Sequence, residues 1–467
     1  MKKIFLILVL LGSMPGLISC EEQLFQSPIT SKELGKFLQN ETEVEEYVNA
    51  VYANLQANGL YGRDFPAVAE TPSDNTYSEV PANDDGVYGQ LDLFTTIPAN
   101  LLVTDAWRES YRTIQRANVV LNRIDKITYA VAATQQARVG EMKFVRALLY
   151  FNLVRLYGDV PLVTGETADP NEYFGKGRAP LAQVYDQIKK DLTEAIGTLP
   201  ETSTQPGKVV KTAAQTLLAK VYLTQKEYAE AKTLLQAVVS SGQHTLLADP
   251  ATVFSINNEN NREVIFAVQF ASGVNGNTEG SPAFQQFAPS GTVAGAKGHN
   301  LPTKSLYALY STADKRRGIY LTATASGVPW GRKLTQPTVI TDGGSDVVVL
   351  RYADVLLMLA EVENETGNAV AAATILDLIR TRAGLTATTA TTQADLRAAI
   401  DLERRLELVS EGHRWFDLLR TGTAIQVMND WFKANNILTT ITAKDLLLPI
   451  PQSQIDTDPA IKQNPGY

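Results

Sequence analysis

The sequence predicts a mainly α-helical protein built on tetratricopeptide-like helix pairs, with a loop-rich lobe that carries short strands. Three observations predict this fold class. Apolar stripes of helical period dominate the first half of the chain, two similar segments recur 141 residues apart, and one long segment is rich in Gly, Asn, Ser, Thr and Pro. About 425 residues follow the N-terminal region, enough to bury a large core.

The helical stripes come in the following order. Apolar residues at helical spacing run over 44–55 and 107–124, and a third helix is expected over 135–157, where Gly158 can cap it. A fourth stripe opens after Pro180 and holds until Gly197. Each of the four has an apolar face to bury, so the helices are expected to pack on each other.

An internal repeat indicates how other helices pack. Segments 218–238 and 359–379 superpose, and the spacing of their small residues resembles the tetratricopeptide helix pair. The two segments are far apart, which favours helix pairs stacked around long insertions over a continuous solenoid. The matched positions are Ala219 with Ala360, Ala231 with Ala372, Leu235 with Leu376, and Val238 with Ile379.

The largest insertion covers residues 244–346, and its short β-like runs include 264–270, with a further run at 347–350 just beyond it. Segment 61–103 has the same loop-rich character. Long ordered loops usually carry function. We therefore divide the domain, 43–467, into a helical core (43–243 and 347–467) and a loop-rich lobe found mainly in 244–346.

The N-terminus is typical of a secretory signal peptide over 1–19, followed by a tether over 20–42. Residues 4–11 are apolar but too few to span a bilayer, and LISC (17–20) resembles a lipobox. Cys20 is the only cysteine, which excludes an intrachain disulfide and a multi-thiolate metal site. We expect Cys20 to be lipidated. The alternative is a chance cysteine behind an ordinary signal peptide.

The net charge of the protein limits which binding partners are expected. Removal of residues 1–19 takes away Lys2 and Lys3 and no acidic residue, so the formal charge moves from −8 to −10. An acidic body is a poor partner for nucleic acid or anionic headgroups. The Cys20-Glu21-Glu22 start resembles the acidic export signal of surface lipoproteins. We expect a lipid-anchored protein of the outer membrane that faces the cell surface.

The stretch ERRLELVSEGHRWFDLLRTG (403–422) concentrates charge beside apolar residues. On a helix, Glu403, Glu407 and Glu411 would align at four-residue spacing and frame a packed apolar face. An enzyme could use His413 oriented by Asp417 as a base. No nucleophile, zinc or phosphate-loop motif accompanies it, although paired carboxylates stay possible. A structural role is favoured, and we expect no catalysis, cofactor or metal site.

Several blocks, in this order along the chain, resemble the SusD/RagB family of nutrient-uptake lipoproteins: NAVY (49–52), EMKFVRALLYFNLVRLYGDVPLV (141–163), RYADVLLMLAE (351–361), the charged stretch 403–422, LLLPIP (446–451) and QNPGY (463–467). The resemblance implies tetratricopeptide-like pairs with a loop-rich ligand lobe. It also implies a SusC-like TonB-dependent transporter as partner, and an oligosaccharide or, in some members, a peptide as ligand. The structural signature residues are Arg351, Tyr352, Glu403, Arg404, Glu407, Glu411, Arg414, Trp415 and Asp417.

A sugar site needs aromatic surfaces beside amide, carboxylate or guanidinium groups. Loop residues that meet this need are Tyr77 with Asp74 and Asn75, Tyr88, and Trp330 with Arg332; Trp330 is the strongest candidate. Each loop aromatic could instead pack under its own loop. Trp107 lies on a helical stripe and is expected in the core.

Two functions from different classes follow. The first is a non-catalytic lipoprotein that binds an oligosaccharide, or a peptide, and delivers it to a transporter. The second is a helical-repeat scaffold whose only ligands are proteins. The sequence does not name the ligand, because loop residues without a shared motif would decide it.

Overall fold

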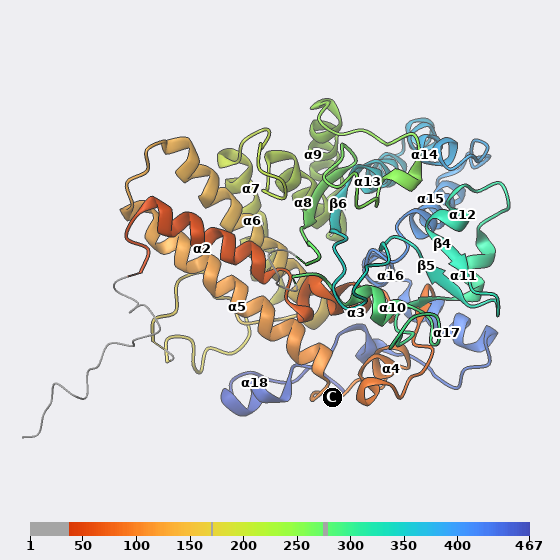
Figure 1. Cartoon of the computed structure of the whole chain (residues 1–467), viewed down its shortest axis with the longest axis horizontal. Helices are drawn as coiled ribbons and strands as arrows, with labels where there is room; N and C mark the ends of the chain where they lie inside the picture. Colours follow the sequence, from red (N-terminus) through yellow and green to blue (C-terminus); the bar gives the residue numbers. More distant parts are fainter. Residues whose placement is uncertain (1–36, 170, 274–278) are drawn as a thin grey trace, which may run out of the picture.

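The computed structural model describes residues 37–169, 171–273 and 279–467 (Figure 1). The predictions for the signal peptide, for lipidation of Cys20 and for most of the tether therefore lie outside the described residues. Long helices occupy one end of the molecule, and short strands with irregular loops occupy the other (Figure 1). No helix in the three described ranges is long and apolar enough to cross a membrane.

The four helices predicted in the first half are present as α2 (Glu41–Asn54), α5 (Leu101–Arg123), α6 (Ala132–Tyr157) and α7 (Leu181–Thr198). Asn40 caps α2 and Asn100 caps α5 with side-chain oxygens that accept from backbone N–H groups. Gly158, with φ 73°, ends α6 as predicted. Trp107 is buried in the core, as expected.

The internal repeat forms two helix pairs, α8 (Lys211–Thr224) with α9 (Tyr228–Ser240), and α13 (Tyr352–Glu365) with α14 (Ala369–Arg382). All eight matched positions of the repeat are fully buried. Helix α9 packs directly on α13, so the pairs adjoin in space although the long insertion separates them in sequence (Figure 1). Small residues at the matched positions allow the helices of each pair to approach closely.

The charged stretch 403–422 is not one helix. Helix α15 (Gln393–Glu407) ends before Glu411, and α16 (Arg414–Thr421) begins after it. Between them Ser410 and Gly412 have φ of 63° and 75°, which an α-helix cannot contain. The prediction that Glu411 continues the helical row is therefore wrong. The last helices are α17 (Ala424–Ala434) and α18 (Gln452–Thr457).

The loop-rich lobe is built from short elements. Within the described residues, three two-stranded antiparallel sheets form: β1 (Thr76–Tyr77) with β3 (Leu301–Pro302), β4 (Leu321–Ala323) with β5 (Pro329–Gly331), and β2 (Val264–Val268) with β6 (Val347–Arg351). The last pair confirms the predicted β-like runs and returns the insertion to the helical core. The short helices are α3 (Asp64–Val68), α4 (Val87–Asp92), α10 (Ala283–Phe287), α11 (Lys304–Leu309) and α12 (Arg316–Ile319). Single 3₁₀ turns lie at Asp84–Gly86, Ile124–Lys126, Pro250–Thr252 and Ala443–Leu446, and a π-turn at Asn58–Gly62.

The core is shared between the two parts. Its main apolar cluster joins α2, α5 to α9, the β2–β6 sheet and α13. A smaller cluster lies in the lobe, where Leu306, Tyr310, Tyr320 and Leu321 pack against Leu406, in the last turn of α15, and Val409, just after the helix. The lobe therefore has an apolar base where α15 ends.

We predict that Ala360→Leu destabilises the protein by about 1–3 kcal/mol, because Ala360 is fully buried within the α13–α14 pair and a larger side chain must displace its neighbours. Denaturant unfolding of the variant measures the change. Val370→Leu is the control, since Val370 is 80% exposed on α14 and should tolerate the change. Equal stability of the two variants would contradict the close packing.

Candidate ligand-binding lobe and the ion pairs that hold it

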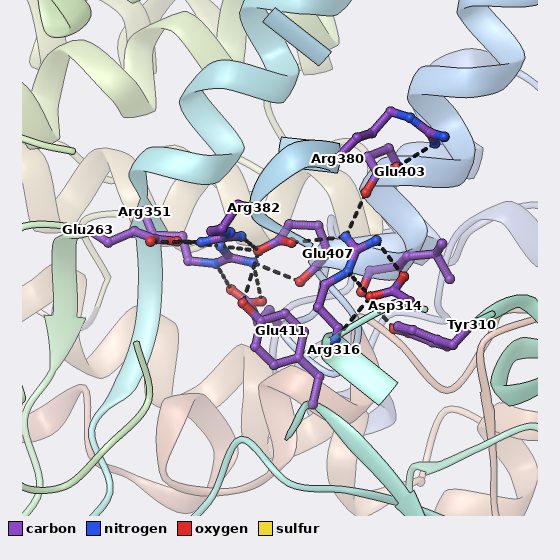
Figure 2. Close-up of polar contacts among 12 residues, drawn as sticks. Glu263, Tyr310, Asp314, Arg316, Arg351, Arg380, Arg382, Glu403, Glu407 and Glu411 are labelled. Carbon is purple, nitrogen blue, oxygen red and sulfur yellow. Dashed lines mark hydrogen bonds and ion pairs between the residues drawn. The ribbon is translucent and has the colours of Figure 1, made fainter. Parts of the chain in front are cut away.

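A buried ion-pair network joins the lobe to the helical core, and Glu407 is its centre. The Glu407 carboxylate accepts hydrogen bonds from Arg351 Nη1 at 2.8 Å, from Arg316 Nη1 at 3.0 Å and from Arg382 Nη2. Figure 2 shows Glu407 between Arg351 and Arg382 on one side and Arg316 on the other. We call this set the lobe network: Glu263, Asp314, Arg316, Lys333, Arg351, Arg382, Glu403, Glu407 and Glu411.

The lobe network reaches across the two parts of the fold. Arg316, on α12 of the lobe, is fully buried and pairs with Asp314 at 2.8 Å and with Glu403 of α15 at 2.7 Å. Lys333 follows β5 and donates to the Glu407 backbone oxygen at 2.9 Å. Glu411 meets Arg351 at 2.7 Å even though it lies beyond the helix. The ion pairs of Arg316 and the hydrogen bond of Lys333 therefore fix loop segments against α15.

The charges around Glu407 keep it ionised. Burial alone would raise its pKa, but the guanidinium groups of Arg382, Arg351 and Arg316 hold the pKa well below its usual value. A buried carboxylate with three cationic partners stabilises the fold only as part of the complete set. Removal of one member leaves the others buried without compensation.

A second set of ion pairs lies on the other side of α15. Arg404 pairs with Asp354 at 2.8 Å and with Asp417 at 3.1 Å, and Asp417 also receives Arg420 at 2.8 Å. Arg414 instead binds Asp74 at 2.8 Å and Asp401 at 2.9 Å. The expected neighbours Arg414 and Asp417 therefore have separate partners. Of the other signature residues, Trp415 is buried with its ring centroid 5.5 Å from that of Phe94, and Tyr352 is half-buried.

His413 is not hydrogen-bonded to Asp417, so Asp417 does not orient the imidazole as a catalytic base. Its Nδ1 lies 3.1 Å from the Lys220 ammonium. Burial, and then the Lys220 charge, lower the His413 pKa to about 3, so the imidazole is neutral at physiological pH. An imidazole whose conjugate acid has a pKa of about 3 is too weak a base to take up a proton near pH 7.

Three of the predicted ligand residues are buried, and their polar groups bond to other residues of the protein. The Asp74 carboxylate is buried between Arg414 and Arg405, and the Asn75 amide bonds to Glu70 and Arg405. Tyr88 is buried with its hydroxyl 2.7 Å from Asp64, and its ring stacks on His299 at 3.8 Å. This placement removes all three from the candidate ligand surface, because their polar groups already have partners within the fold.

Of the remaining predicted residues, Trp330 and Tyr77 lie on short strands and Arg332 directly follows one. Trp330 is half-buried on β5, and its ring centroid lies 5.7 Å from that of the buried Phe284. Arg332 is exposed and places its guanidinium carbon 5.2 Å from the Trp330 ring centroid. Tyr77 is half-buried on β1, which pairs with β3, and β3 packs beside β5. Trp330, Arg332 and Tyr77 form the candidate ligand surface.

Sequence reasoning missed a cavity of about 110 Å³ between the helical core and the lobe, which we call the lobe–core cavity. Its lining combines Phe151 of α6, Phe254 and Phe287 of the lobe, and Gly331, the residue after Trp330. These residues come from distant segments, so no local pattern could have joined them. Within the described ranges, no group of three or more His, Cys, Asp or Glu side chains is placed to hold a metal ion.

We predict that Glu407→Gln lowers stability by about 3–5 kcal/mol at neutral pH, because it leaves buried guanidinium groups without their charge partner. The folded pKa of Glu407 is lowered, so its contribution is complete above the pKa of an unfolded glutamate, about 4.3, and is lost as pH falls below it. Thermal unfolding from pH 7 down to 3 should show the difference between the native protein and the variant shrink.

The matched control is Glu46→Gln, since Glu46 is exposed on α2 and should show no such difference at any pH. A stability difference that stays constant between pH 7 and 3 would show that Glu407 does not act through its charge.

Comparison with known proteins adds to this geometry. The family model described as "Starch-binding associating with outer membrane" matches residues 29–223, and the model described as "SusD family" matches residues 321–467. A SusD-like protein of Formosa agariphila is 27% identical over 96% of this chain and 97% of its own length.

Solved structures share the fold over nearly all of their length. A "Laminarin binding SusD-like protein" superposes with a TM-score of 0.80 and 27% identity, covering 92% of this chain and 100% of that one. "Surface glycan-binding protein A" of Bacteroides uniformis superposes with a TM-score of 0.79 and 23% identity, covering 91% and 99%. Family models that match both ends of the chain, and relatives that span it, lead to one conclusion: the chain belongs to the SusD/RagB family.

Proposed function

We propose that this protein is a surface glycan-binding lipoprotein of the outer membrane, which binds an oligosaccharide without changing it chemically and hands it to a SusC-like TonB-dependent transporter. The family model over residues 29–223 is described as starch-binding and associated with the outer membrane, and two similar solved proteins are named for glycan binding. The transporter partner rests on the family resemblance of the sequence.

The observation that carries the proposal is the partly exposed Trp330 beside the exposed Arg332. An aromatic face packs on the C–H face of a sugar, and a guanidinium donates to hydroxyl oxygens. Phe284 supports the ring from the buried side. The lobe network fixes Lys333, three residues after Trp330, against α15, so it holds the chain directly behind the surface.

The first ligand to test is laminarin, because the similar solved protein with 27% identity is named for binding it. A peptide ligand, or a scaffold that binds only proteins, is the competing function. The ligand surface favours the glycan, since a tryptophan ring beside an exposed guanidinium supplies the aromatic face and the hydroxyl-directed donor that a sugar needs.

We predict that Trp330→Ala weakens binding of laminarin oligosaccharides roughly 5- to 150-fold, which corresponds to about 1–3 kcal/mol for loss of an aromatic anchor. Calorimetry on the mature protein measures the affinity, and product analysis after titration tests whether the sugar is unchanged. The control is Phe174→Ala, which removes an aromatic side chain that is 58% exposed in the loop before α7.

Equal affinity of the native protein and of Trp330→Ala, with both folded by circular dichroism, would contradict the proposed surface. Failure of the native protein to bind laminarin and a wider glycan panel, with the transporter still captured, would favour the protein-only scaffold. Cleavage of the sugar would contradict the non-catalytic function.

We also predict that Cys20→Ala releases the protein from the membrane fraction, because no other lipid attachment site is expected near the N-terminus. Fractionation of cells that lack the partner transporter measures this, so that a protein contact cannot retain the variant. A variant that still sediments with outer membranes would contradict lipid anchoring through Cys20.

A further inference from the structure

A buried guanidinium without a carboxylate partner lines the lobe–core cavity. Arg155 of α6 donates from Nε to the Phe151 backbone oxygen at 2.9 Å and from Nη2 to Asn152 Oδ1 at 2.7 Å. Its guanidinium lies between two rings, 3.8 Å from the centroid of Phe151 and 3.7 Å from that of Phe416. Among the residues that the structure describes, none offers Arg155 a carboxylate within ion-pair distance.

The exposed part of Arg155 faces the cavity. Burial lowers the Arg155 pKa to about 10, so the group remains cationic at neutral pH. A minor part of the side chain is still exposed, and Arg155 is one of the residues that line the lobe–core cavity. Nη1 has no acceptor among the described residues. Buried charges in proteins are normally paired, because an unpaired one loses its hydration without compensation.

His413 supplies a second free donor to the same wall. The Lys220 ammonium, paired with Asp354 at 2.8 Å, can only donate to His413 Nδ1, which therefore accepts. A neutral imidazole then carries its proton on Nε2, and no described residue accepts from that atom. Arg155 and His413 line both the lobe–core cavity and a smaller one beside Met358, so they lie in the wall between the two.

The acidic residues of the lining do not compensate Arg155. Glu411 is taken by Arg351 at 2.7 Å and by Lys333. Asp346 accepts from the Phe270 amide at 2.8 Å, and burial raises its pKa to about 7, so much of it is uncharged near neutral pH. Asp417 acts on Arg155 only from beyond ion-pair distance and is paired with Arg404 and Arg420.

We propose that the lobe–core cavity binds a small organic carboxylate, whose oxygens accept from Arg155 Nη1 and His413 Nε2 and whose carbon skeleton packs on the aromatic lining. Guanidinium groups are suited to carboxylates, and an apolar pocket with a few convergent donors is typical of a small-molecule site. A sealed cavity of about 150 Å³ holds benzene. A volume of about 110 Å³ therefore suits a short aliphatic acid or the carboxylate end of an acidic sugar. The site is separate from the Trp330 surface and does not depend on glycan binding there.

Calorimetry with the mature protein tests the site through matched pairs of probes. Propionate is compared with propionamide, and glucuronate with glucose, so that each pair differs mainly in charge. We expect at least one acid to bind with a Kd near the millimolar range and at least tenfold more tightly than its neutral partner. Binding of propionate without binding of glucuronate would indicate that the ligand is a free short-chain acid. Binding of glucuronate would indicate that the carboxylate belongs to an acidic sugar.

Variants locate the interaction. Arg155→Gln should weaken binding of the acid at least tenfold, while the matched control Arg317→Gln, at an exposed arginine of the lobe, should leave it unchanged. In case Arg155→Gln does not fold, crystals of the native protein soaked in 3-bromopropionate give an independent test, with bromine anomalous signal expected in the cavity. Equal binding of acid and neutral partner, unchanged affinity in folded Arg155→Gln, no binding of either acid, or a cavity that holds only water would each overturn the proposal.

Discussion

The buried carboxylate of Glu407 connects the two parts of this protein. It ends α15 of the helical core, and it receives a guanidinium from the lobe, from β6 and from α14 at once. Replacement of such a network by apolar residues of the same volume could give equal stability. Ion pairs require one geometry, however, whereas apolar contacts tolerate several. We infer that the lobe network fixes a single arrangement of lobe and core.

This constraint matters because the lobe cannot order itself. The β1–β3 and β4–β5 sheets have strands of two or three residues, and isolated two-stranded sheets are marginal in water. The small apolar cluster under β4 is completed by Leu406, in the last turn of α15, and by Val409, just beyond it. Trp330 therefore depends, through β5 and Lys333, on contacts made at one helix end. A binding surface built on loops needs this kind of support to hold its geometry.

The sequence predicted the helical framework well and the lobe poorly, for a physical reason. An amphipathic helix carries its burial pattern in its own residues, so the four early helices and the matched positions such as Ala219 and Ala360 could be recognised locally. Asp74 and Tyr88 look like exposed loop residues. Asp74 is nevertheless buried in an ion pair with Arg414, which lies 340 residues further along the sequence. The break at Ser410 was also hidden, because serine rarely has positive φ. The charges of 403–422 form ion pairs inside the fold, but their partners are decided by tertiary contacts.

Hydrogen exchange of the Glu407→Gln variant tests the central claim, that this carboxylate orders the ligand lobe, most directly. Amides of the β4–β5 hairpin should exchange much faster than in the native protein, while amides of α2 and α7, which contribute no residue to the lobe network, should keep their protection. Unchanged protection of residues 321–331, or a uniform loss of protection across all helices, would contradict the claim.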